Sequence, residues 1–416
     1  MFLFDCPTQL FSSSAEKFIC RQLSPSRPCS QARGGSLPQS SLPLTLLLSL
    51  LSTNMSSKGK KDLILMERGN GNETGSQKQK RIQWIDALRG LVIFLMVLGH
   101  NIQYGGGENW LKESLFFENI CFRFIYSFHM PCLMLVSGFF YGHSIKKSNL
   151  LSNRIKTVLI PTLIWSLIPI GMVLFSGLRS NQVNGLAWDC LSILFSYYWF
   201  MWAILFGSLM IWIVHNYCQD NIFVYSLIGI ALLFFPDNVF GIKIYFWFFM
   251  YPFFVVGFLW NIRKINEKVR PNNYYFAAVI VLYVAHLFLY DKRCYIYTTG
   301  ISVRSLEQFS IDILRFLVGF SGSAMAIMLV FYLYRFFEKK MVWINTFFSY
   351  LGRISLLFYF IDGLKHCFLP RITKNIPFNY GYVMIETLLC VILYIAIDFM
   401  ISRSQLARKF LLGGRG

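Results

Sequence analysis

The stretch that decides the fold is 84-WIDALRGLVIFLMVLGHN-101, which is apolar at most of its positions. At ~1.5 Å per residue, a helix of this length nearly crosses the ~30 Å hydrocarbon core of a bilayer. Similar apolar runs follow it to the end of the chain. We therefore predict an all-α fold, a polytopic bundle of transmembrane helices.

The composition agrees with a membrane protein. Hydrophobic residues make up 55% of the 416 residues and charged residues only 14%. A soluble domain of this size could not bury so much apolar surface. The formal net charge of +19 does not indicate a nucleic-acid partner, because the basic residues occur in short clusters between apolar runs. Such clusters are typical of cytoplasmic loops beside anionic membrane lipid.

The apolar runs predict about ten spans. They cover residues 84–103, 119–142, 155–176, 193–215, 221–236, 243–260, 274–290, 311–336, 346–368 and 380–401. If the first span starts inside, the basic clusters at 146–156, 263–270, 339–340 and 403–409 all lie on the cytosolic side. The opposite loops carry fewer basic residues over a greater length. We therefore expect both ends of the membrane domain in the cytosol.

Three regions follow from this pattern. Residues 1–80 form a basic leader that we expect to be disordered. It contains a short leucine-rich run at 46–51, too far from the start for an ordinary signal peptide, so we favour a true start at Met55 or Met66. Residues 81–402 form the membrane domain, and residues 403–416 form a short basic cytosolic tail.

The first span carries three ionisable side chains on one face. Asp86 and Arg89 are three residues apart, and His100 follows Arg89 by eleven residues, about three helical turns and ~16 Å of rise. Ionisable groups inside a membrane cost free energy and commonly mark functional sites. The alternative is structural: an ion pair at the helix end and an interfacial histidine.

Polar residues recur in the next two spans. His129 lies near the middle of the second, two residues before Pro131, which interrupts the backbone hydrogen bonds and could open a polar pocket. A histidine bonded to a neighbouring carbonyl is the alternative. Arg154 and Lys156 precede the third span and suit phosphate binding, although the preference for positive charge inside also explains them. The chain has no Walker, HExxH or GxSxG motif, so nucleotide hydrolysis and those zinc or serine hydrolase classes have no support. We expect no metal and no bound cofactor.

Several motifs together carry a family resemblance. They are 81-RIQWIDALRG-90, 98-LGH-100, 127-SFHMP-131, 137-SGFFY-141, 154-RIK-156 and 161-PTLIWS-166. In this order and spacing the chain resembles the acyltransferase 3 family of membrane O-acyltransferases, which have about ten spans. A later segment, 352-GRISLLFYFID-362, resembles a family segment that often ends in histidine, where this chain has Asp362.

The resemblance implies transfer of an acyl group, usually acetyl from acetyl-CoA, to a hydroxyl of a cell-surface carbohydrate. It implies a multi-pass protein of the plasma (inner) membrane, with acyl-CoA as cosubstrate and a carbohydrate as acceptor. His100 matches the essential histidine of the family, and Arg89 stands at its motif arginine.

A mechanism follows as a hypothesis. His100 is the general base, and Asp86 and Arg89 hold the cytosolic end of its helix. Arg89, Arg154 and Lys156 face the phosphates of CoA. His129 polarises the thioester oxygen or orients the acceptor. The alternative function is a transporter or flippase of a lipid-linked saccharide that uses the same polar stripe.

Overall fold

The computed structural model describes residues 83–104, 115–145, 149–175, 185–236, 242–265, 272–301, 303, 305–365 and 376–414. These residues form helices and no β-strand, which confirms the all-α prediction. The predicted leader and its alternative start sites lie outside the described residues.

The helices follow one another in the chain with short connections. They are α4 (Gln83–Tyr104), α6 (Leu115–Glu118), α7 (Ile120–Ser144), α8 (Leu150–Arg154), the π-helix η1 (Ile155–Leu159), α9 (Ile160–Phe175), α10 (Gly185–Ser196), α11 (Trp199–Cys218), α12 (Ile222–Leu232), α13 (Tyr245–Ile262), α15 (Asn273–Leu289), the 3-10 helix η2 (Lys292–Cys294), α16 (Ile296–Thr299), α17 (Leu306–Lys340), α18 (Val342–Arg353), α19 (Ser355–Lys365), α21 (Tyr380–Ser402) and α22 (Gln405–Leu411).

Seven helical segments among the described residues are long and apolar enough to cross a membrane. They are α4, α7, the continuous run from α8 to α9, α11, α13, α17 and α21. Three shorter apolar helices occur at α10, α12 and α15. This arrangement confirms a polytopic helix bundle, and each of the ten predicted spans overlaps at least one helix.

The structure corrects the prediction at two segments in the second half of the chain. The span predicted at 346–368 is not one helix, because α18 and α19 meet at Ile354 with a bend of 68°. The predicted basic tail contains α22, which packs on α9, where Trp165 Nε1 donates to the Leu411 carbonyl at 3.0 Å. Neither feature follows from hydrophobic periodicity, because both depend on contacts with other helices.

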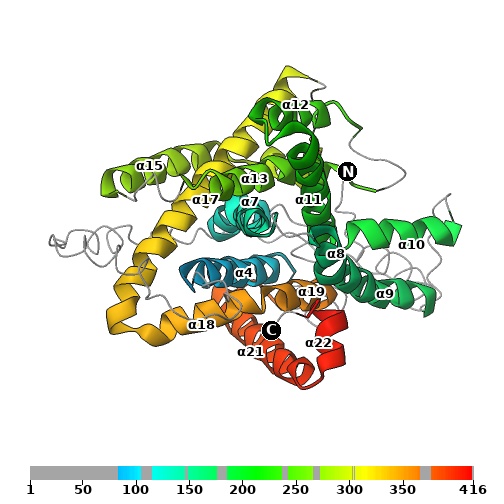
Figure 1. The fold of residues 1–416 in the computed structure, drawn as a ribbon. Coiled ribbons are helices and arrows are strands. Elements are labelled where there is room, and N and C mark those ends of the chain that lie inside the picture. The colour runs from blue at the N-terminus through cyan, green and yellow to red at the C-terminus, as the bar shows by residue number, and fades with distance from the viewer. Residues whose placement is uncertain are drawn as a thin grey trace, which may run out of the picture. The chain divides into compact units, whose positions relative to one another are not determined.

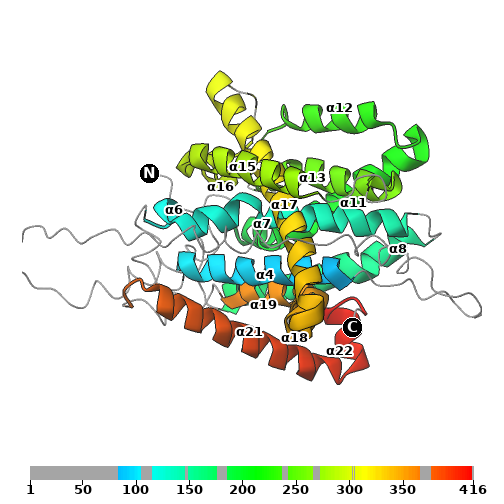
Figure 2. The same ribbon diagram turned by 90° about the vertical axis from the view of Figure 1, so that its left-hand side faces the viewer.

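Helices α4 and α7 lie side by side at the centre of the bundle (Figures 1 and 2). α13 packs on α7, and α18 and α21 pack on α4 (Figure 1). The long helix α17 crosses this group and contacts both central helices (Figure 2). The side chains between α4, α7 and α19 are therefore enclosed by helices from both halves of the membrane domain.

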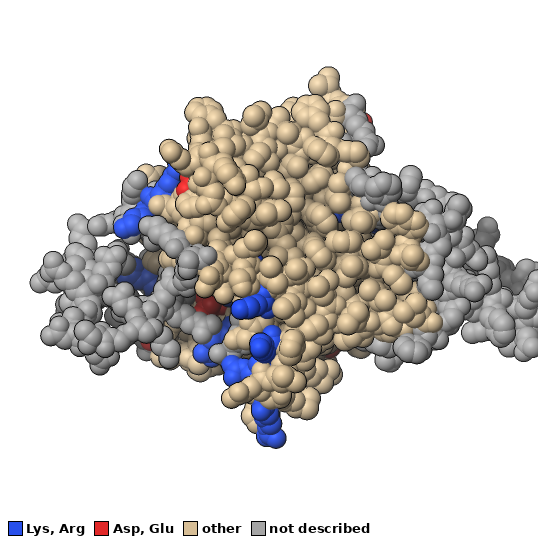
Figure 3. All heavy atoms as spheres, turned by 45° about the vertical axis from the view of Figure 1, so that its right-hand side comes forward, with Lys and Arg blue, Asp and Glu red and all other residues tan. Residues whose placement is uncertain are grey.

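The outward faces are apolar. Large hydrophobic side chains are exposed along α12, α15 and α21, among them Phe223, Phe288 and Ile392. On the face drawn in Figure 3, the described Lys and Arg side chains gather in a few small areas, and most of the surface carries no charge. A surface of this kind suits contact with lipid rather than water.

Glycines allow α4 and α18 to approach closely. A Cβ atom added to Gly90 would collide with the Phe348 carbonyl oxygen, and one added to Gly352 would collide with the Asp86 carbonyl oxygen. Small residues at such contacts are the usual means of close helix packing in membranes. The contact lies beside Asp86 and Arg89 and so holds their end of α4.

We expect Gly352→Ala to lower the thermal unfolding temperature in detergent, because the new methyl group must push α18 off α4. Overpacking of this kind costs roughly 1–3 kcal/mol. Gly171→Ala in α9 is the matched control, since a Cβ there meets nothing within 4 Å. Equal melting temperatures for the two variants would contradict this account of the packing.

Candidate active site

The central feature of the site is a histidine–carboxylate pair between α4 and α19. His100 Nδ1 lies 2.5 Å from Asp362 Oδ2. The Asp362 side chain is fully buried, whereas 22% of the His100 side chain is exposed. An ionised carboxylate can only accept, so Nδ1–H donates and the Nε2 of the neutral ring keeps a lone pair. The imidazole is thus oriented with Nε2 pointing away from Asp362, as a general base requires.

Asp362 is also held by two donors on its other oxygen. Lys365 Nζ lies 2.7 Å from Oδ1, and the Tyr394 hydroxyl donates to Oδ1 at 2.9 Å. Lys365 Nζ also donates to Asn101 Oδ1 at 2.5 Å, and Asn101 Nδ2 donates to Thr387 Oγ1 at 3.0 Å. This network joins α4, α19 and α21, and a fully bonded buried network restrains the side chains within it.

An aromatic block of the sequence positions α19 from its other side. The Tyr197 hydroxyl donates to the Gly363 carbonyl at 2.9 Å, and the Tyr198 hydroxyl donates to the Phe360 carbonyl at 3.1 Å. Both carbonyls lie within three residues of Asp362. These tyrosines begin the block 197-YYWFMW-202, and through these bonds they fix the helix that carries the carboxylate.

The opposite end of α4 holds the predicted Asp86–Arg89 pair. Arg89 Nη1 lies 3.7 Å from Asp86 Oδ1, and Nη2 donates to Ser355 Oγ at 2.8 Å. Ser355 and Asp362 are seven residues apart on α19, two turns on one face. The structure therefore brings both Arg89 and His100 to the same neighbouring helix, as expected of side chains on one stripe.

His129 lies near His100 but makes a local bond. Its Nδ1 is 2.9 Å from the Ile125 carbonyl oxygen in the same helix, and the side chain is buried. The ring of Tyr126 contacts both imidazoles, with centroid distances of 4.9 Å to His129 and 6.1 Å to His100. α7 continues through Pro131 without a break. This hydrogen bond to a carbonyl of the same helix agrees with the alternative interpretation of His129 from the sequence, a histidine bonded to a neighbouring carbonyl.

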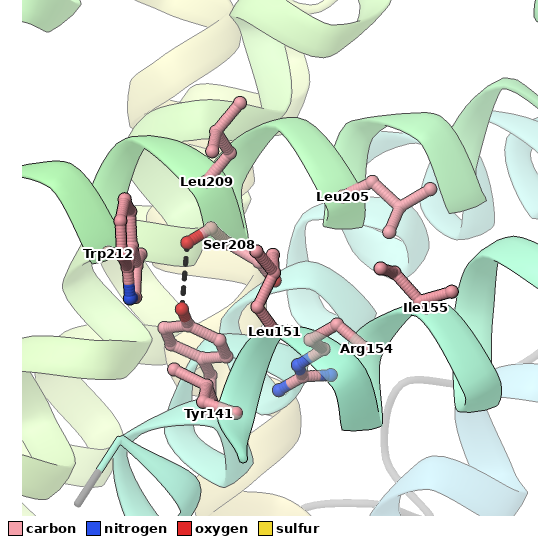
Figure 4. A pocket seen from close by; sticks show the side chains of 9 residues that line it. Tyr141, Leu151, Arg154, Ile155, Leu205, Ser208, Leu209 and Trp212 are labelled. Atoms are coloured by element: carbon pink, nitrogen blue, oxygen red, sulfur yellow. Dashed lines mark hydrogen bonds between the residues drawn. The ribbon is translucent and has the colours of Figure 1, made fainter. Parts of the chain in front are cut away.

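Arg154 and Lys156 occupy the turn where α8 becomes the π-helix η1. The Arg154 guanidinium lies 4.6 Å from the centroid of the Tyr141 ring. It lines a small cavity of about 50 Å³ between α7, α8 and α11 that also includes Leu205, Ser208 and Trp212 (Figure 4). The Tyr141 hydroxyl donates to the Ser208 carbonyl at 2.8 Å. Lys156, two residues on, is exposed.

The two arginines predicted to bind the donor pack against the aromatic rings of two consecutive residues of α7. Arg89 lies 5.7 Å from the centroid of Phe140, and Arg154 lies 4.6 Å from that of Tyr141. Consecutive residues of a helix point about 100° apart. The guanidinium groups are therefore on adjacent sides of the same end of α7, the end predicted to face the cytosol.

Several charged residues near the site could have been recognised from the sequence but are missing from the predicted site residues. Asp362 and Lys365 are charged residues three apart inside a predicted span, the same signal that marked Asp86 and Arg89. Glu386 is one of two carboxylates, with Asp398, in the apolar run of α21. Among the described residues, no group of three or more His, Cys, Asp or Glu side chains could hold a metal ion.

Comparison with known proteins identifies the family. A family model described as an acyltransferase domain matches residues 82–398, more than half of the chain. Nodulation protein NolL of Mesorhizobium japonicum is 25% identical over 293 residues, which cover 67% of this chain and 74% of the relative. Nodulation protein NolL of Sinorhizobium fredii is 25% identical over 310 residues, covering 71% and 79%. No solved structure matches the chain. The family match confirms the resemblance of the sequence motifs: the chain belongs to the acyltransferase 3 family and is a multi-pass membrane acyltransferase.

Proposed function

We propose that the protein transfers an acetyl group from acetyl-CoA to a hydroxyl group of a cell-surface carbohydrate, at the plasma membrane. The observation that carries this proposal is the His100–Asp362 pair, an oriented and partly exposed imidazole inside a membrane bundle. The membership in an acyltransferase family favours this reaction over the transporter alternative.

The reaction needs one base that later acts as an acid. His100 Nε2 removes the proton of the acceptor hydroxyl as its oxygen attacks the thioester carbonyl carbon. The tetrahedral intermediate then collapses, the carbon–sulfur bond breaks, and Nε2 returns the proton to the CoA sulfur. The products are the ester and free CoA, with no net change in protons. Asp362 holds the ring and stabilises the imidazolium formed between the two steps.

The donor enters from the Arg89 end of the site. CoA carries phosphate groups, and arginine binds phosphate with paired hydrogen bonds. Arg154 suits this role because its guanidinium stacks on Tyr141 and makes no hydrogen bond with the residues that the structure describes. Arg89 is held by Asp86 and Ser355 and presents a fixed charge, and the exposed Lys156 adds a further positive charge at this end.

His129 is better suited to orienting the acceptor than to polarising the thioester oxygen. In the neutral ring, Nδ1–H donates to the Ile125 carbonyl, so Nε2 has no proton to donate to an oxygen. The ring instead packs against Tyr126, whose hydroxyl donates to Gln103 Oε1 at 2.7 Å. We therefore assign His129 a positioning role through Tyr126.

The direct test uses purified protein in nanodiscs with acetyl-CoA labelled in the acetyl group. Transfer is shown by label in the carbohydrate, and mild alkali should release it as acetate because the product is an ester. A carrier would leave the carbohydrate unlabelled. The absence of label in every surface carbohydrate offered would overturn the proposal.

Arg154→Ala is expected to raise the KM for acetyl-CoA by roughly 10–100-fold, because a hydrogen bond to a charged group contributes about 1.5–3 kcal/mol. S-acetylpantetheine, which lacks the CoA phosphates, should show the same KM with the variant and the wild type. Arg403→Ala is the matched control, since Arg403 makes a similar stacking contact at 4.5 Å with Phe399 at the end of α21. An equal rise for both thioesters would show that Arg154 acts through packing and does not bind phosphate.

A further inference from the structure

Glu386 is a buried carboxylate that the mechanism above does not use. It lies on α21, its residue is 7% exposed, and neither carboxylate oxygen has a hydrogen-bond partner among the described residues. Its helix neighbours Ile385, Leu388 and Leu389 are exposed on the outer face. Glu386 therefore points into the bundle, where an apolar side chain would be cheaper to bury.

Its surroundings place it beside the catalytic pair. Lys365 and Asp362 are the charged groups near enough to Glu386 to interact with it electrostatically. The next residue, Thr387, accepts a hydrogen bond at 3.0 Å from Asn101, the residue that follows His100. Glu386 is thus at the His100 end of the site, remote from the arginines that face the donor.

A ligand that donates hydrogen bonds fits this position. A buried polar group without a partner costs about 1–3 kcal/mol, and more when it is charged, so two unbonded carboxylate oxygens favour a partner that arrives with the substrate. Lys365 does not fill this role, because it bonds Asp362 and Asn101 and makes no hydrogen bond to either oxygen of Glu386. The thioester of the donor offers only acceptor atoms, and the CoA phosphates carry the wrong charge. A carbohydrate presents adjacent hydroxyl groups, each of which can donate.

We propose that Glu386 is an acceptor-binding residue that accepts hydrogen bonds from one or two hydroxyl groups next to the hydroxyl being acylated. This inference rests on the proposed function and narrows it: the acceptor must carry a hydroxyl neighbouring the reacting one. Sites that hydrogen-bond a substrate hydroxyl discriminate strongly against analogues that lack it, because the buried partner is then left unpaired. Glu386 would in this way select the acceptor without taking part in proton transfer.

The test is two-substrate kinetics with Glu386→Gln, which keeps the size of the side chain but removes its charge and one acceptor. The acceptors are methyl glycosides of glucose, galactose, mannose and N-acetylglucosamine, together with their monodeoxy analogues. We expect the KM for the acceptor to rise by roughly 10–100-fold, with the KM for acetyl-CoA unchanged. Removing the neighbouring hydroxyl should raise the KM for the acceptor with the wild type. It should raise that KM little further with the variant, because both changes delete the same interaction.

Asp398→Asn is the matched control. Asp398 is also a buried carboxylate of α21, but it accepts from the Tyr350 hydroxyl at 3.0 Å, twelve residues further along the helix. We expect this variant to lower the melting temperature and to leave the KM for the acceptor unchanged.

The possible failures are distinguishable. Wild-type protein that labels none of the glycosides would overturn the proposed function, and this inference with it. Wild-type transfer combined with an unchanged acceptor KM in Glu386→Gln would overturn the inference alone. A variant whose KM rises equally for acetyl-CoA and acceptor would also overturn it, because that result indicates a general disturbance of the site.

Discussion

Replacing His100 by alanine is expected to lower kcat for acetyl transfer by ~10²–10⁴-fold, the range typical of a lost general base. Alanine leaves the acceptor hydroxyl without a group to take its proton and leaves the departing sulfur without a proton donor. The KM for acetyl-CoA should change little, since the arginines assigned to the donor lie at the other end of α4. The measurement is the rate of labelled ester formation by purified protein in nanodiscs at saturating acetyl-CoA.

The chain offers a matched control for this variant. His215 Nδ1 lies 2.8 Å from Asp220 Oδ2 at the end of α11, so it forms a second histidine–carboxylate pair outside the site. His215→Ala should keep the wild-type kcat. If His100→Ala retained wild-type activity, or if both variants lost it equally, the assignment of His100 as the base would be wrong.

Asp362→Asn is expected to lower kcat over a similar range, by roughly 10²–10⁴-fold. The amide fills the same volume, but it carries no charge to stabilise the imidazolium. It can also present its NH₂ group to Nδ1, which favours the tautomer with the proton on Nε2. A general base needs a lone pair on that nitrogen. The same assay measures this variant, with the melting temperature recorded in parallel.

The melting temperature matters because Asp362 also pairs with Lys365 in a largely buried site. Breaking a buried ion pair by removing one partner costs about 3–5 kcal/mol. Asp312→Asn controls for this loss, because Asp312 forms a buried pair with Arg315 on α17 at 2.5 Å. We expect both variants to be less stable, but only Asp362→Asn to lose activity at temperatures where both remain folded. Equal activity of the two folded variants would exclude a role for Asp362 in catalysis.

The sequence predicted the class of the fold because a membrane helix can be recognised from its own residues alone. A run of about twenty apolar residues has few ways to satisfy its backbone in lipid except as a helix. For this reason α4, α7, α13 and α21 occur within a few residues of their predicted positions. The predicted span 193–215 joins the end of α10 to α11, since the residues that connect them, Tyr197 and Tyr198, are themselves aromatic and continue the apolar pattern. The first part of α10, before residue 193, lies outside every predicted span.

The break between α18 and α19 was beyond prediction for a different reason. The segment around Ile354 has the composition of one continuous span, and no proline marks the bend of 68°. The path of α19 depends on Gly352 packing against α4 and on the tyrosines that bind the carbonyls of α19. These contacts join residues far apart in the chain and leave no periodic signal.

The sequence by itself determined that Arg89 and His100 share one face of a membrane helix, because helical periodicity is a local property and the two residues are only eleven positions apart. Only the tertiary structure decided which group holds the imidazole. Asp362 lies 262 residues from His100, and its apposition depends on the bend before α19 and on the packing of α19 against α4. Side-chain spacing along one helix can be read from the chain, whereas a pairing between helices is set by how the whole bundle closes.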